Sequence, residues 1–117
     1  MSNYLECKDP LIGKEKAISD LAGRPDLYEK YFSRFVENYS NSYFDIVSLI
    51  KDGQFNEAMR LSHSIKGLSR TLGLLPLGDA AELLELSLKE NQEPDKINKS
   101  LTIFHQKFIE LLDVVSK

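Results

Sequence analysis

The residue best placed to do chemistry is a histidine on the outer face of a predicted helix. Between Ala58 and Leu72, apolar residues recur at intervals of three and four, which is the pattern of one buried helix face. At about 100° per residue, His63 falls almost opposite this stripe. Its imidazole is therefore expected to face water or a partner. A neutral imidazole, with an unperturbed pKa of about 6.5, is a good nucleophile near neutral pH and can accept a phosphoryl group.

A glycine lies one turn after this histidine, on the same outer face. Gly67 lies inside the helix predicted over residues 54–72, where an exposed glycine costs about 1 kcal/mol relative to alanine. A side chain at this position would crowd the ring of His63 or an incoming group. We therefore interpret Gly67 as a source of steric access, with a merely tolerated glycine as the alternative.

The charges around His63 are basic, although the chain as a whole is acidic. Between residues 58 and 78 the charged residues are Arg60, Lys66 and Arg70, whereas the whole chain has a formal net charge of -3. Cations within a few Å stabilise a dianionic group. Lys66 and Arg70 are direct neighbours of His63 on this face, and a contact of Arg70, about two turns from His63, with a phosphate or an acidic partner is a hypothesis. A solvated basic face is the alternative.

An acid on the next predicted helix is the candidate that orients the imidazole. A histidine in steady use donates one ring N–H to a fixed acceptor, which sets the tautomer and aims the other nitrogen outward. Glu85 lies about 70° from the centre of its helix's apolar stripe, at the margin where a side chain reaches a neighbouring helix. The spacing alone also fits one more solvated acid.

The elements that must position these residues are helices. Proline, glycine and apolar periodicity mark their ends, and no segment alternates with the period of two that strands show. A length of 117 residues fits one domain. We therefore predict an all-α fold, an antiparallel up-down-up-down four-helix bundle with a short additional N-terminal helix. The predicted helices occupy residues 10–22, 25–51, 54–72, 76–90 and 94–116.

The composition argues against several classes of protein. An acidic chain is a poor match for nucleic-acid phosphates, and no apolar run approaches the roughly 20 residues that span a bilayer. The single cysteine, Cys7, forms no internal disulfide, and the histidines and cysteine show no metal-ligand spacing. We expect a cytoplasmic protein that binds neither nucleic acid nor membrane and holds no metal.

The remaining candidates receive structural interpretations. His105 lies about 80° from the centre of the last helix's stripe, so we expect a boundary residue there. Tyr28, Tyr31 and Phe32 are expected in the core first, and whether any of them docks a partner stays open. Cys7 has no visible base beside it, which argues against a nucleophilic role.

As a set, these residues resemble the histidine-containing phosphotransfer (HPt) domains of phosphorelays. Those domains carry H-x-x-K-G, an L/I-G pair at the end of the same helix, a leucine, and an L-E/Q pair on the next helix. The matching residues here are His63 to Gly67, Leu72-Gly73, Leu77 and Leu84-Glu85. The family usually has small residues between the motif glycine and the L-G pair. Leu68, which we expect to continue the buried stripe, and Arg70 depart from that pattern.

The resemblance implies a role for each site residue. His63 would accept and donate the phosphoryl group, Lys66 would screen its charge, Gly67 would give the partner access, and Glu85 would orient the ring. The implied partners are response-regulator receiver domains or hybrid sensor histidine kinases, with docking on the outer surface of the second and third helices. Receiver aspartate and Mg²⁺ would supply most of the catalysis, so the chain would be a phosphoryl carrier without a cofactor and not an enzyme. We expect a monomer.

Two other functions fit a helical bundle. One is an adaptor or scaffold that binds a receiver or kinase without phosphotransfer, which the intact His63, Lys66 and Gly67 disfavour. The other is the dimerisation and phosphoacceptor region of a sensor kinase, whose histidine is normally followed by an acid and then a proline. Neither follows His63 in that way.

Overall fold

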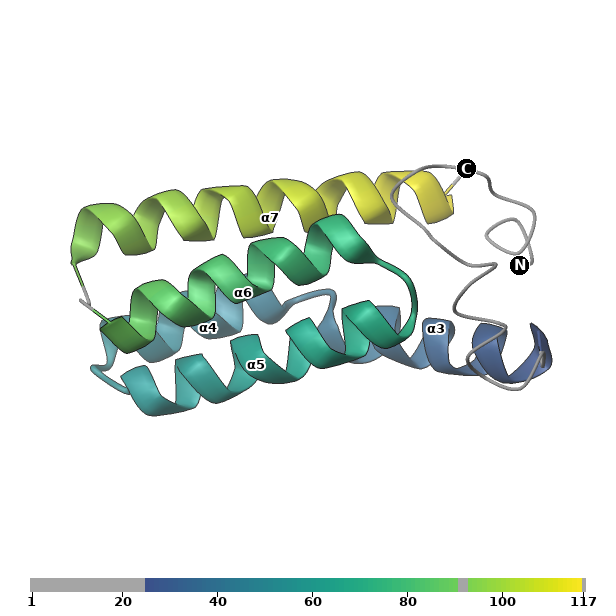
Figure 1. The fold of residues 1–117 in the computed structure, drawn as a ribbon, viewed down its shortest axis with the longest axis horizontal. Helices are drawn as coiled ribbons and strands as arrows, with labels where there is room; N and C mark the ends of the chain where they lie inside the picture. The colour runs from purple at the N-terminus through teal and green to yellow at the C-terminus, as the bar shows by residue number, and fades with distance from the viewer. Residues whose placement is uncertain (1–24, 91–92, 117) are drawn as a thin grey trace.

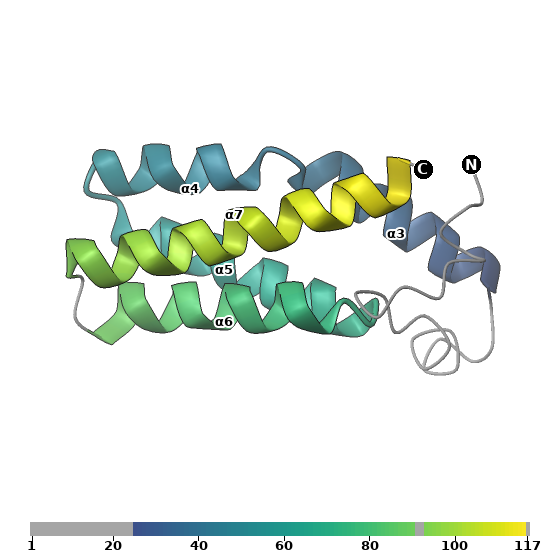
Figure 2. The same ribbon diagram turned by 90° about the horizontal axis from the view of Figure 1, so that it is seen from above.

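The structure, a computed structural model, is a bundle of helices. It describes residues 25–90 and 93–116, and every regular element within them is an α-helix. Successive members of the bundle run in opposite directions along one long axis (Figures 1 and 2). The all-α bundle predicted from the sequence is confirmed, while the predicted helix over 10–22 lies outside the described residues. The helices are α3 (Pro25–Tyr39), α4 (Ser42–Lys51), α5 (Phe55–Thr71), α6 (Leu75–Glu90) and α7 (Pro94–Ser116).

The first member of the bundle is bent, and the prediction of one unbroken helix over 25–51 is wrong at this point. Two turn residues, Ser40 and Asn41, separate α3 from α4. They lie among the asparagines and serines of residues 38–42, and both residue types have low helix propensity because their side chains can hydrogen-bond the backbone in non-helical conformations. α3 extends past the ends of the other helices (Figure 1). The bounds of α5, α6 and α7 agree with the predicted 54–72, 76–90 and 94–116 to within one residue at each end.

Glycine turns bound the helix that carries His63. Gly53 precedes α5 and Gly73 follows it, and both adopt a φ of 76°, where glycine carries no Cβ penalty. At the end of α5, the backbone N–H of Leu74 donates to the carbonyl of Ser69 at 2.7 Å, which is the long hydrogen bond of a Schellman motif. The chain therefore reverses directly into α6, so α5 and α6 lie antiparallel (Figure 1).

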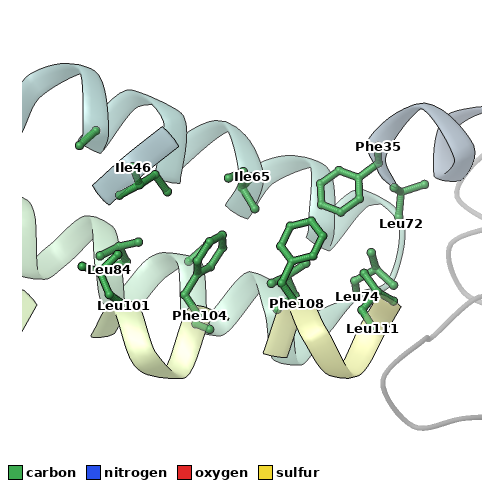
Figure 3. Packing of buried hydrophobic residues seen from close by; sticks show 14 of the residues in the cluster. Phe35, Ile46, Ile65, Leu72, Leu74, Leu84, Leu101, Phe104, Phe108 and Leu111 are labelled. Atoms are coloured by element: carbon green, nitrogen blue, oxygen red, sulfur yellow. The ribbon is translucent and has the colours of Figure 1, made fainter. Parts of the chain in front are cut away.

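The core fixes the rotation of each helix about its own axis. The rings of Phe35 on α3 and Phe108 on α7 stack with centroids 5.8 Å apart, and Figure 3 shows them facing one another across the bundle. Tyr28 is fully buried and its hydroxyl donates to the carbonyl of Leu72 at 3.0 Å, so α3 also holds the end of α5. Each fully buried apolar side chain of this size contributes about 1.5–3 kcal/mol, which disfavours any other rotation.

The buried face of α5 differs from the predicted one. Its buried residues are Ala58, Ser62, Ile65 and Ser69, whereas Leu68, expected in the stripe, is 40% exposed. Ser62 is tolerated in the core because its hydroxyl donates to the carbonyl of Ala58 at 2.9 Å. Relative to the predicted stripe, the buried face is turned by about 40°. This rotation of α5 about its own axis brings the face that carries His63 closer to α6.

Candidate functional site

His63 stands on the outside of α5, as the sequence predicts. Its side chain is 65% exposed. Its Nδ1 lies 2.9 Å from Oε2 of Glu85 on α6, so the hydrogen bond expected between these two side chains is present. An ionised carboxylate only accepts hydrogen bonds. Nδ1 must therefore donate, and this tautomer leaves the lone pair on Nε2.

Glu85 holds a second group besides the imidazole. Its other oxygen, Oε1, lies 2.8 Å from Nζ of Lys66, and both side chains are largely buried, with 17% and 19% of their surface exposed. Partial burial alone would raise the pKa of the Glu85 carboxyl. The hydrogen bonds and charges of Lys66 and, after it, His63 outweigh that effect, so this pKa lies below its usual value. Glu85 is therefore a carboxylate at neutral pH.

Lys66 is not the free cation that the sequence pattern suggests. Its ammonium is in an ion pair with the carboxylate that also holds the His63 ring. Because the two oxygens of one carboxylate bind the two side chains, Lys66 and the imidazole are held next to each other. The positive charge near His63 is thus built into a triad, with its position fixed by Glu85.

Arg70 is likewise engaged within the chain. Its Nη2 lies 2.9 Å from Oε2 of Glu82 and 3.2 Å from Oδ1 of Asp79, both on α6. The hydrogen bonds of Glu82 and then Asp79 raise the pKa of Arg70 above its usual value. Sequence reasoning missed these partners, although acids at 79, 82 and 85 already mark one edge of α6. The predicted contact of Arg70 with a phosphate or a partner stays a prediction.

Gly67 borders open space. A Cβ built on Gly67 meets no heavy atom within 4 Å, apart from its chain neighbours and the local helix backbone. The packing of this chain therefore does not require the glycine. The expectation that a side chain here would crowd the His63 ring is wrong for a Cβ, since the ring lies more than 4 Å away from it. Access for an incoming partner stays a prediction, with a merely tolerated glycine as the alternative.

An apolar groove of about 370 Å³ lies on the other side of the exposed α5 face, between α3 and the end of α5. Leu68 and Tyr31, which is 43% exposed, line it together with Arg34 and Thr71. Thr71 also donates from Oγ1 to the carbonyl of Gly67 at 2.9 Å. The exposed face of α5 thus carries the imidazole of His63 and, through Leu68, one wall of the groove, and Gly67 lies between these two side chains.

The other candidates have structural positions. His105 is half-buried between α4 and α7, where its ring stacks on Tyr43 with centroids 3.9 Å apart, so the boundary position predicted for it is confirmed. Tyr28 and Phe32 are in the core, as expected. The core position expected for Tyr31 is wrong, because its ring is exposed and lines the groove between α3 and α5. Cys7 lies outside the described residues.

Among residues 25–90 and 93–116, no group of three or more His, Cys, Asp or Glu side chains is arranged to hold a metal ion. No helix in the same ranges combines the length and the apolarity that crossing a membrane requires.

The fold and the site together define a helical-bundle protein that presents an imidazole on its surface, oriented by a carboxylate of the neighbouring helix. The family model described as "Hpt domain" matches residues 30–114, and the chain belongs to this family. Neither the curated proteins nor the solved structures gave a match. Hpt domains are histidine phosphotransfer carriers of two-component systems, rather than classical enzymes, and they interact with receiver domains and kinases.

Proposed function

We propose that this chain carries a phosphoryl group on Nε2 of His63 and exchanges it reversibly with the aspartate of a receiver domain in a phosphorelay. The observation that carries the proposal is the 2.9 Å hydrogen bond from Nδ1 of His63 to Glu85 on an otherwise exposed ring. It supports the proposal because, with the proton on Nδ1, the lone pair of Nε2 is free to act as the nucleophile.

The proposed step needs no proton transfer at the ring. The Nε2 lone pair attacks the phosphorus of an aspartyl phosphate, an N–P bond forms, and the P–O bond to the aspartate breaks. The aspartate leaves as a carboxylate. The ring, which keeps its Nδ1 proton, becomes positively charged, and the Glu85 carboxylate 2.9 Å away stabilises that charge. Return of the phosphoryl group to an aspartate reverses each change.

Lys66 and Gly67 act at the same atom. The ammonium of Lys66, fixed 2.8 Å from Glu85, offsets the negative charge of the phosphoryl group once it is bound to the ring. The open space at Gly67 lets the receiver's aspartate approach the imidazole. Mg²⁺ belongs to the partner in this proposal, and the chain itself brings no cofactor.

Docking uses the exposed face of α5 and the groove beside α3. Tyr31 and Leu68 supply apolar surface, and Arg34 supplies charge at the rim. A modest interface of this kind, with exposed apolar side chains ringed by polar ones, suits a transient complex. We propose that the chain does this as a monomer in the cytoplasm.

Transfer from a phosphorylated receiver domain tests the proposal. The protein is incubated with the phosphorylated receiver, and label that is acid-labile and alkali-stable is measured on the wild type and on His63→Gln. The chain has two histidines, so His105→Gln is the matched control. We expect label on the wild type and on His105→Gln, and none on His63→Gln. Equal label on all three proteins would reject His63 as the acceptor. No label on the wild type would favour an adaptor that binds receivers without phosphotransfer.

A further inference from the structure

The contact between α5 and α6 holds a second ion-pair set beside the His63 triad. Nη2 of Arg70 bridges Asp79 and Glu82, at 3.2 and 2.9 Å. Arg70 lies one helical turn after Lys66 on α5, and Glu82 lies one turn before Glu85 on α6. The two sets are therefore neighbours along the same pair of antiparallel helices.

A buried glycine on α6 makes room for Arg70. A Cβ added to Gly78 would lie 2.9 Å from Cγ of Arg70, which is closer than real Cβ atoms come to other atoms. The same Cβ would lie 3.6 Å from the backbone carbonyl oxygen of Lys66. The missing side chain thus lets the aliphatic stem of Arg70 pass over Gly78 of α6. The backbone of Lys66, one turn earlier on α5, lies beside the same glycine, and the ammonium of Lys66 is bound to Glu85.

We infer that Arg70 is a positioning residue, which fixes α6 against α5 through Gly78, Asp79 and Glu82 so that Glu85 meets the His63 imidazole. An arginine suits this task because its planar guanidinium bonds two carboxylates in a fixed geometry, whereas a lysine is a single flexible charge. An isolated surface pair contributes little to stability. The function inferred here is geometric, since a hydrogen bond weakens steeply when its partners move out of line.

This inference rests on the proposed function only for its effect on transfer. Its structural part concerns the Nδ1 hydrogen bond and is measured without any partner. Nitrogen NMR of the ¹⁵N-labelled protein reports which ring nitrogen of His63 carries the proton. In the wild type, Nδ1 is expected to be protonated and Nε2 to be the free nitrogen.

Two variants remove the bridge from opposite sides. Arg70→Gln removes the cation, and Asp79→Asn combined with Glu82→Gln removes both acceptors while keeping the arginine. Arg60→Gln is the matched control, because Arg60 pairs at 3.0 Å with Glu57 on its own helix and bridges nothing to α6. Both bridge variants are expected to lose the single Nδ1–H pattern of His63 and to show a mixture of tautomers. The control keeps the wild-type pattern.

Gly78→Ala and Arg70→Lys complete the test. Gly78→Ala displaces the Arg70 stem, so we expect the same mixture of tautomers with the arginine still present. Arg70→Lys keeps the charge but not the two-carboxylate geometry, and is expected to restore the Nδ1–H pattern only in part. Transfer from a phosphorylated receiver is expected to fall about tenfold or more in Arg70→Gln, because misplacement of a reacting group by about 1 Å can cost about 10²-fold.

The outcomes separate this inference from the proposed function. A wild-type imidazole pattern in the folded Arg70→Gln protein, or in the folded double variant, would overturn the positioning role even if His63 accepts phosphate normally. Changed tautomers in a chain that accepts no phosphoryl group would keep the positioning role and reject the function. Circular dichroism of each variant establishes that the helices are intact.

Discussion

The ammonium of Lys66 lies 2.8 Å from Oε1 of Glu85, and less than a fifth of each of these two side chains is exposed. The same carboxylate accepts the Nδ1 hydrogen bond of His63 through its other oxygen. One acid on α6 therefore fixes the nucleophile and the nearest cation on α5 together. The ion pair is expected to contribute to the stability of the fold, and the hydrogen bond to phosphoryl transfer, so the two contributions can be measured separately.

Replacement of Lys66 by methionine is expected to destabilise the fold. It leaves a largely buried carboxylate without its ammonium partner, which should lower the free energy of unfolding by about 1–3 kcal/mol. Urea denaturation measures this loss. Lys96→Met is the control, since Lys96 is 58% exposed and its nitrogen lies 3.8 Å from Glu93, so the change there should stay within about 0.5 kcal/mol. Equal effects at the two positions would contradict the triad.

The lowered pKa of Glu85 predicts a pH-dependent stability. A carboxyl whose pKa is lower in the folded state stabilises the fold above its usual pKa, and this contribution is lost as the pH falls through the lowered value. The wild type should therefore exceed Glu85→Gln in stability most at neutral pH. The difference should shrink as the pH falls from about 5 to 3. Denaturation curves of both proteins across this range check the prediction, and a constant difference would contradict it.

Gly67→Ala should make the fold more stable and the carrier worse. The added methyl group meets open space, and alanine in an exposed helix is better than glycine by about 0.5–1 kcal/mol. Denaturation should show this gain, while transfer from a phosphorylated receiver to His63 should slow. Unchanged transfer would mean that the missing side chain serves no partner.

The sequence predicted the parts of the site that depend on one helix at a time. The exposure of His63 follows from its angle to the apolar stripe of α5, and the reach of Glu85 follows from its place at the edge of the α6 stripe. The partners of Arg70 come from a different helix, so the absence of acids between residues 58 and 78 gave no sign of its ion pairs with Asp79 and Glu82. Ser62, counted as polar by its type, is buried because it bonds its own helix.

The groove beside the site should matter for docking. Leu68→Asp places a charge in the groove without disturbing the core, because Leu68 is already 40% exposed. The affinity for a receiver domain, measured by titration calorimetry, should fall about tenfold or more, because the variant buries a charge in a desolvated contact. Ile109→Asp is the control, since Ile109 is 50% exposed on α7 and lies outside the groove. Equal weakening by the two variants would argue against docking at the groove.

The most direct measurement locates the phosphorus atom. The ¹⁵N-histidine-labelled protein is phosphorylated with phosphoramidate, a small donor that needs no partner protein, and the phosphorylated ring nitrogen is identified by NMR. Because Glu85 holds the proton on Nδ1 of His63, the phosphoryl group is predicted on Nε2 of His63. Phosphorylation on Nδ1 of His63, or on His105 alone, would contradict the account.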